Sequence, residues 1–369
     1  MAGVFFESLT FGIYYSIIRP YMEFLGAAYT LIFLIDLTYA LVGLTSIVWG
    51  YLSDVYGRDK PIYAGILGFI PLLLLSSITD PIEIIIVSTI FFTFYIMAQP
   101  AILALTSQCT SIGRGFAYYT IASSLGWGVG GVVMGLIHDT LGFGVRGVFI
   151  VSAVSWIISF SLFTISIRGL KVPSGNAKLK LTIPKNIRLL FIVQLLAFAG
   201  INWFFPLAAL KVHEMLGGDK LLYGIIWGFL PTITSLIVSP FVGKLADLHG
   251  GVKMYFIALA SYTFLLPLLA YTQGLLFIIL WLVPLWPFYH IGVNSAASQL
   301  SNIHERGEAL GAITTATNVS IILAFLGGIF ADILGRETSM VLSAIPLMIS
   351  TLIAYFRLLK VESGGLLEK

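Results

Sequence analysis

The sequence predicts an all-α integral membrane protein whose twelve transmembrane helices form two six-helix bundles, related as parallel repeats. Three observations predict this fold class. Charged residues make up 10% of the 369 residues, whereas soluble domains carry about 25%. Apolar runs of about 20 residues, long enough to cross a hydrocarbon layer of about 30 Å, recur along the chain. Finally, short motifs of the first half return in the second half at a nearly constant distance.

The predicted spans are bounded by proline, glycine or charged residues. They cover residues 3–22, 28–50, 60–78, 82–107, 114–138, 144–168, 186–210, 220–244, 252–272, 274–300, 307–332 and 337–360. The first run has no charged region before it, so we expect a transmembrane helix and not a cleaved signal.

A polar linker separates the sixth span from the seventh. Residues 168–188, RGLKVPSGNAKLKLTIPKNIR, hold six positive charges and no negative one. We therefore expect an N-terminal bundle at 1–168, a cytoplasmic linker at 169–185 and a C-terminal bundle at 186–369.

The positive charges fall mainly on one side of this topology. Fifteen of the 20 lysines and arginines lie on the side of the linker and both termini, and four lie on the other. Because cytoplasmic loops carry an excess of positive charge, both termini are predicted to be cytoplasmic. We expect the plasma (inner) membrane.

Several function classes are disfavoured by the composition. A net charge of +3 without a long basic run does not suit nucleic acid. The single cysteine, Cys109, excludes an internal disulfide, and the five scattered histidines lack metal-ligand spacings. No nucleotide-binding loop is present. We expect no cofactor, no metal, no nucleic acid and a monomer in the lipid bilayer.

Three pairs of motifs form the internal repeat. GYLSDVYG at 50–57 returns as GKLADLHG at 243–250, and DTLG from Asp139 returns as DILG from Asp332, both at an offset of 193. MEFLG ending at Gly26 returns as HEMLG ending at Gly217, at an offset of 191. Near-constant offsets at three places indicate a duplicated bundle with its axis along the membrane normal.

The 50–57 motif and its repeat resemble the signature of the Major Facilitator Superfamily of secondary transporters. The resemblance implies a latch at the cytoplasmic face, in which Asp54 lies near the turn at Arg306 and Asp247 near the turn at Arg114. A solvated loop is the alternative. The predicted gating residues are Gly50, Asp54, Gly57, Arg58, Gly243, Asp247, Gly250, Arg114 and Arg306.

The resemblance also implies a substrate cavity between the halves, lined by the first, fourth, seventh and tenth helices. Polar residues there are informative, because burying a polar group is costly unless it is paired. The candidates are Tyr14, Tyr15, Arg19, Gln99, Asn202, Trp203, His290 and Asn294. For His290, a hydrogen-bonded interior residue, a substrate contact and a proton relay all stay open.

Two acidic residues lie within predicted spans and are candidates for proton coupling. Asp36 is eight residues past Ala28 and thus roughly 12 Å inside the outer end of its helix. It could load a proton, pair with Arg19 or face an outer vestibule. Glu7, about one turn inside the cytoplasmic end of the first helix, is the second candidate.

Two departures from family patterns bear on mechanism. The fourth helix lacks the arginine of many proton-coupled members, and the fifth has Trp127 where many antiporters have proline, although Gly130 and Gly131 keep a surface for close packing. These departures weaken the case for drug and proton exchange and leave uniport open.

We predict a secondary transporter that moves a small organic solute by alternating access of a rocker-switch kind, with or without proton coupling. A multidrug or metabolite efflux antiporter is the alternative within transport. A non-transporting receptor and a membrane-embedded enzyme are alternatives from other classes. We expect no enzyme, because His138 and Asp139 are matched in the repeat by Ala331 and Asp332, with no histidine.

Overall fold

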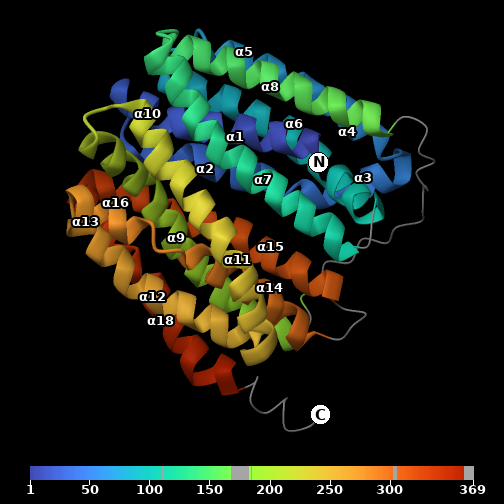
Figure 1. Ribbon diagram of the computed structural model, residues 1–369, viewed down its shortest axis with the longest axis vertical. Coiled ribbons are helices and arrows are strands. Elements are labelled where there is room, and N and C mark those ends of the chain that lie inside the picture. The colour runs from blue at the N-terminus through green and yellow to red at the C-terminus, as the bar shows by residue number, and fades with distance from the viewer. Residues whose placement is uncertain (110–111, 168–182, 184, 302–305, 361–369) are drawn as a thin grey trace. The chain divides into compact units, whose positions relative to one another are not determined.

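The computed structural model describes residues 1–109, 112–167, 183, 185–301 and 306–360, without the side chains of 47, 54, 104–109, 112–117 and 306–308. Every regular element in these ranges is helical, which confirms the predicted all-α class (Figure 1).

The helices of the first half lie within residues 2–167. They are α1 (Ala2–Phe24), α2 (Tyr29–Gly43), α3 (Ser46–Tyr56), α4 (Asp59–Gly65), η1 (Ile66–Gly68), α5 (Phe69–Leu75), α6 (Pro81–Cys109), α7 (Ile112–Gly135), η2 (Leu136–Thr140) and α8 (Gly144–Ile167).

The helices of the second half lie within residues 185–358. They are η3 (Lys185–Ile187), α9 (Arg188–Met215), α10 (Lys220–Tyr223), η4 (Gly224–Phe229), α11 (Leu230–His249), α12 (Gly251–Tyr271), α13 (Gly274–Trp281), α14 (Leu285–Leu300), α15 (Arg306–Ala324), α16 (Leu326–Leu334), α17 (Arg336–Leu342), α18 (Ala344–Ile353) and η5 (Ala354–Leu358).

Within the described ranges, nine helical segments are long and apolar enough to cross a membrane, and α2 is a shorter apolar helix. The predicted span at 28–50 is interrupted, since α2 ends at Gly43 and α3 runs from Ser46 to Tyr56. At the break, the Thr45 hydroxyl donates to the Val42 carbonyl (2.6 Å) and accepts from the Trp49 indole (3.1 Å). Such local side-chain bonds compete with the helical ladder.

The chain forms two compact units whose boundaries differ from the sequence halves. The first unit contains Met1–Ala27, Thr38–Lys180 and Val212–Thr232, and the second contains Ala28–Leu37, Leu181–Lys211 and Ile233–Lys369. The start of α2 thus belongs to the second unit. The α10–η4 segment belongs to the first unit.

In the first unit, α1 lies against α7 and α8 (Figure 1), and glycines of α7 allow a close approach. A Cβ atom on Gly130 would lie 2.6 Å from the Leu9 carbonyl oxygen, and one on Gly126 would lie 2.3 Å from that of Phe5. A different face of α7 meets η4, where a Cβ on Gly131 would lie 3.0 Å from the Gly224 carbonyl oxygen. The predicted close packing at Gly130 and Gly131 is confirmed.

In the second unit, α12 packs against α14, α17 and α18. A Cβ on Gly292 of α14 would lie 2.5 Å from the backbone nitrogen of Tyr255 on α12. The Ser350 hydroxyl of α18 donates to the Val193 carbonyl of α9 (2.9 Å).

The turns repeat between the halves as the sequence does. Gly57 and Gly250 have φ of 102° and 93°, and both end a motif copy. Gly26 and Gly217 (φ 78° and 64°) form a second pair, and Gly142 and Gly335 (φ 69° and 85°) a third. Left-handed backbone of this kind is unfavourable for residues with a Cβ, so the duplicated motifs mark duplicated turns.

Candidate functional site

In the first unit, the predicted cavity residues divide into packing and polar groups. Tyr14 is fully buried, with its ring 5.7 Å from those of Phe91 and Phe92. Tyr15 and Arg19 are half-buried, and the Arg19 guanidinium lies 5.2 Å from the Tyr15 ring centroid. This distance is within the range of a cation–π contact.

Gln99 is also half-buried and extends this polar group on α6. Its amide nitrogen donates to the Tyr95 hydroxyl (2.9 Å), and the Tyr95 ring lies 4.5 Å from that of Phe11 on α1. The first and fourth predicted spans therefore share an aromatic and polar surface.

Glu7 is the most unusual polar residue of this unit. The residue is 2% exposed, and neither carboxylate oxygen has a hydrogen-bond partner among the described residues. Tyr95 and Tyr119 lie near enough to interact electrostatically with it. An unpaired buried carboxylate is costly, so it is a strong candidate for function.

Gln194 organises a polar cluster in the second unit. Its carbonyl oxygen accepts from the hydroxyls of Tyr255 and Tyr289, both at 2.8 Å, and its amide nitrogen donates to the Thr317 hydroxyl at 2.9 Å. The cluster joins α9, α12, α14 and α15. Neither Gln194 nor Tyr255 is among the predicted cavity residues. Gln194 lies on the seventh predicted span, whereas Tyr255 lies on a helix outside the four that the resemblance singled out.

His290 and Asn294 lie beside this cluster on α14. The His290 ring stacks on that of Trp286 (5.8 Å, 18°), and the Asn294 amide donates to the His290 carbonyl (2.8 Å). Trp286 and His290 are exposed and Asn294 is half-buried. A polar stripe of this kind is unfavourable against lipid and suits a water-filled cavity.

The two candidates on α9 differ in their surroundings. Trp203 is buried, stacks on Phe330 (5.5 Å) and donates its indole N–H to the Ser339 hydroxyl (2.9 Å). Asn202 is half-buried, and its amide nitrogen has no hydrogen-bond partner in the described part of the chain.

The predicted gating contacts involve side chains outside the described residues. Those of Asp54, Arg114 and Arg306 are among them, so the latch stays a prediction. Asp247 is exposed, and Arg58 and Asp36 are half-buried. Gly50 and Gly243 lie within helices α3 and α11.

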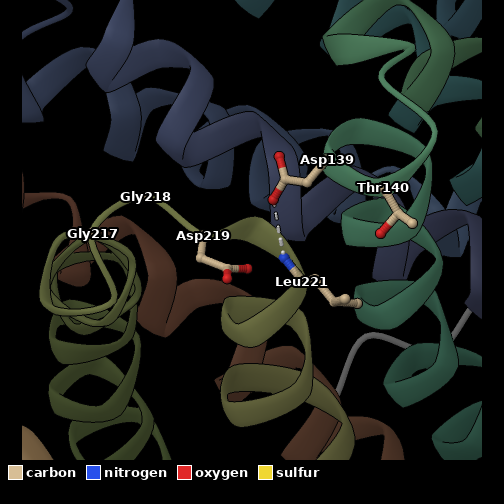
Figure 2. A pocket seen from close by; sticks show the side chains of 6 residues that line it. All are labelled: Asp139, Thr140, Gly217, Gly218, Asp219 and Leu221. Carbon is tan, nitrogen blue, oxygen red and sulfur yellow. Dashed lines mark hydrogen bonds between the residues drawn. The ribbon is translucent and has the colours of Figure 1, made fainter.

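A hollow of about 500 Å³ lies beside the end of η2, at the predicted outer face (Figure 2). Asp139 borders it, and its Oδ2 accepts from the backbone nitrogens of Lys220 (2.7 Å) and Leu221 (3.3 Å). Asp219 caps its own helix by accepting from the Leu222 nitrogen (2.9 Å). Among the described residues, no three His, Cys, Asp or Glu side chains gather in a way that could hold a metal ion.

Comparison with known proteins agrees with this architecture. The family model of the Major Facilitator Superfamily matches the chain twice, over residues 1–189 and 190–368. The chain therefore belongs to this superfamily of membrane transporters and is an integral, multi-pass membrane protein with a small-molecule substrate.

Relatives and solved structures are similar at low sequence identity. A transporter of this superfamily from Methanocaldococcus jannaschii is 24% identical over 93% of this chain and 92% of its own length. The multidrug resistance protein MdtG of Salmonella typhimurium is 25% identical over 64% of this chain and 62% of its own length. The nucleoside transporter NupG superposes with a TM-score of 0.79 at 16% identity, covering 96% of this chain and 97% of that one.

Proposed function

We propose that this protein transports a small organic solute by alternating access, with Glu7 as the group that carries a coupled proton. Residues 1–168 and 186–369 move against each other about the linker at 169–185. The solute contacts Tyr15, Arg19 and Gln99 from the first half, and His290, Asn294 and Asn202 from the second.

The burial of Glu7, without a hydrogen-bond partner among the described residues, is the observation that supports this proposal. Burying a carboxylate without a hydrogen-bond donor among the described residues is costly, and that cost falls when a conformational change brings water, a donor or a proton to it. Proton loading is then linked to the conformation, which is the requirement for coupling. Asp36 is half-buried and is the second candidate for this role.

The test begins with a ligand. A melting screen against sugars, carboxylates, amino acids and lipophilic cations should reveal one chemical class, because a ligand at 100 times its Kd stabilises the folded state by about 2.7 kcal/mol. Transport of the hit is then measured in proteoliposomes.

Glu7→Gln should abolish accumulation driven by a pH gradient and retain exchange of labelled for unlabelled solute, because exchange needs no net proton movement. Asp36→Asn tests the second candidate in the same assay, and it should retain both activities if Glu7 carries the proton. Accumulation that survives in Glu7→Gln would refute the role of Glu7, and uniport would then be the better description.

Efflux of amphipathic compounds is the second candidate, supported by the similarity to MdtG and by aromatic contacts along α1. The Phe11 ring contacts that of Tyr95, and the Tyr15 ring lies 5.6 Å from that of Trp127. Such surfaces bind organic cations well. A stabilising lipophilic cation in the screen would favour this candidate.

We also propose a monomer in the plasma (inner) membrane with both termini in the cytoplasm, on the basis of the charge distribution.

A further inference from the structure

A helix start from the second sequence half is seated against the end of α7. The backbone nitrogens of Lys220 and Leu221 donate to Asp139 Oδ2, as Figure 2 shows for Leu221. One helical turn before Asp139, Gly135 leaves room for this helix, since a Cβ there would lie 2.3 Å from the Leu221 Cα. The first N–H groups of a helix have no partner within it, so Asp139 satisfies two that would otherwise be orphaned.

The same arrangement occurs at the end of α16 with a helix start from the first sequence half. Asp332 accepts from the backbone nitrogens of Tyr29 (2.8 Å) and Thr30 (2.9 Å), the first two residues of α2. One turn earlier, a Cβ on Gly328 would lie 2.9 Å from the Thr30 Cα.

The contacts of Asp139 and Asp332 correspond to each other in the internal repeat. Gly135 and Asp139 correspond to Gly328 and Asp332 at the offset of 193, and Tyr29 and Thr30 correspond to Lys220 and Leu221 at the offset of 191. Each seat is a Gly-x-x-x-Asp segment that receives a helix of the opposite sequence half. We refer to residues 135–139 with 220–221 as the first seat, and to 328–332 with 29–30 as the second.

The third contact of each carboxylate differs between the seats. Asp139 has the His138 imidazole against its Oδ1 (2.6 Å), whereas the Thr30 hydroxyl donates to Asp332. The repeat places Ala331 opposite His138 and Leu221 opposite Thr30. Each seat thus has one extra hydrogen-bonding group, obtained from a different partner.

We propose that these two seats are the outer gate of the transporter, and that Asp139 and Asp332 are its positioning residues. This inference rests on the proposed alternating access. Because each seat joins helices of opposite sequence halves, the proposed movement of residues 1–168 against 186–369 separates both seats when the outer face opens and re-forms them when it closes. A carboxylate at a helix start also interacts favourably with the helix dipole, which adds to the stability of the closed gate.

The test uses a cysteine buried behind the first seat. Ser16 is 5% exposed, and its hydroxyl lies 3.3 Å from the position of a Cβ on Gly131, where α7 meets Gly224. Ser16→Cys in a Cys109→Ser background is exposed to a membrane-impermeant maleimide from the outer side of oriented vesicles. A second reporter cysteine at the cytoplasmic face is measured in parallel.

Asp139→Ala should raise the labelling rate of Ser16→Cys about fivefold, the factor that follows from losing a typical cap. Asp332→Ala should raise it by a similar factor although Asp332 lies in the second seat, and the double variant by about 25-fold if the effects are independent. Asp139→Asn and Asp332→Asn keep an acceptor oxygen and should restore most of the protection.

Asp80→Ala is the matched control. Asp80 also caps a helix at the predicted outer face, by accepting from Ile82 and Glu83 nitrogens (2.9 and 3.0 Å), but that helix is its own. The labelling rate should not change. The milder Thr30→Val removes only the hydroxyl donor of the second seat and should give a smaller rise, which keeps the test usable if an alanine variant does not fold.

The outcomes distinguish a failure of the outer gate from a failure of the proposed alternating access. If Asp139→Ala raises labelling but Asp332→Ala and Thr30→Val do not, the seats act locally and the gate is wrong. If substitutions in neither seat raise the labelling rate of Ser16→Cys, the gate is also wrong. If both seats raise outer labelling and the cytoplasmic reporter shows no matching loss, the gate holds and the proposed alternating access fails.

Discussion

At the scale of single residues, Gln194 shows how one amide organises a membrane bundle. It holds two tyrosine hydroxyls and one threonine hydroxyl at 2.8–2.9 Å. It is 2% exposed. Its three hydrogen bonds fix the positions of Tyr255 and Tyr289, and Tyr289 contacts Trp286 next to His290. The polar stripe of α14 is therefore positioned by a residue that is not itself exposed.

Gln194→Leu should lower the free energy of unfolding by about 2 kcal/mol, because two buried tyrosine hydroxyls lose their acceptor at about 1 kcal/mol each. Thermal melting in detergent measures this change. Tyr255→Phe removes a single hydroxyl and should cost about half as much. Equal melting temperatures for Gln194→Leu and the unmodified protein would contradict the cluster.

At the scale of helices, glycine decides how closely α1 and α7 approach. Two faces of α7 carry glycines. Gly126 and Gly130 face α1, while Gly131 and Gly135 face η4 and α10. In lipid there is no hydrophobic force between helices, so close backbone contact supplies much of the packing energy. The same helix thus packs closely against helices of both sequence halves.

Gly130→Ala should destabilise the protein by about 2 kcal/mol, because its Cβ would lie 2.6 Å from the Leu9 carbonyl and 2.8 Å from the Gly12 Cα, both of them backbone atoms. Gly311→Ala on α15 is the matched control, since no atom of the described residues outside its own helical turns lies within 4 Å of its added Cβ. It should stabilise by about 0.5–1 kcal/mol. Melting temperatures that fall in both variants would show that the loss at Gly130 is not steric.

At the scale of the whole molecule, two sets of contacts are proposed to oppose each other. The outer seats at Asp139 and Asp332 favour closure of the outer face. The motif at Gly50–Gly57 and its repeat are proposed to favour closure of the cytoplasmic face. A transporter requires both states at comparable free energy, so contacts of a few kcal/mol on each side are enough to set the balance.

Asp54→Asn should shift this balance away from the cytoplasm-closed state. Cytoplasmic reporter cysteines should label faster, and Ser16→Cys should label more slowly from the outer side. Asp247→Asn tests the second motif copy in the same way. Unchanged labelling on both faces would leave the motif as a solvated loop.

Sequence alone determined the large-scale features. Low charge, repeated apolar runs and offsets of 193 and 191 specify an all-helical, duplicated membrane protein, because lipid admits few other ways to satisfy the backbone. The paired turn glycines follow the same offsets, since backbone with positive φ depends on the local residue.

Only the tertiary structure decided which polar groups are paired. Glu7 and Asp36 looked alike as acids in apolar runs, with Asp36 the more prominent, yet it is Glu7 that is fully buried without a hydrogen-bond partner among the described residues. Asp139 directly follows one predicted span and Asp332 ends another, but each caps a helix distant in sequence. Hydrogen-bond partners depend on atoms meeting in space, and neither hydropathy nor periodicity encodes which helices meet.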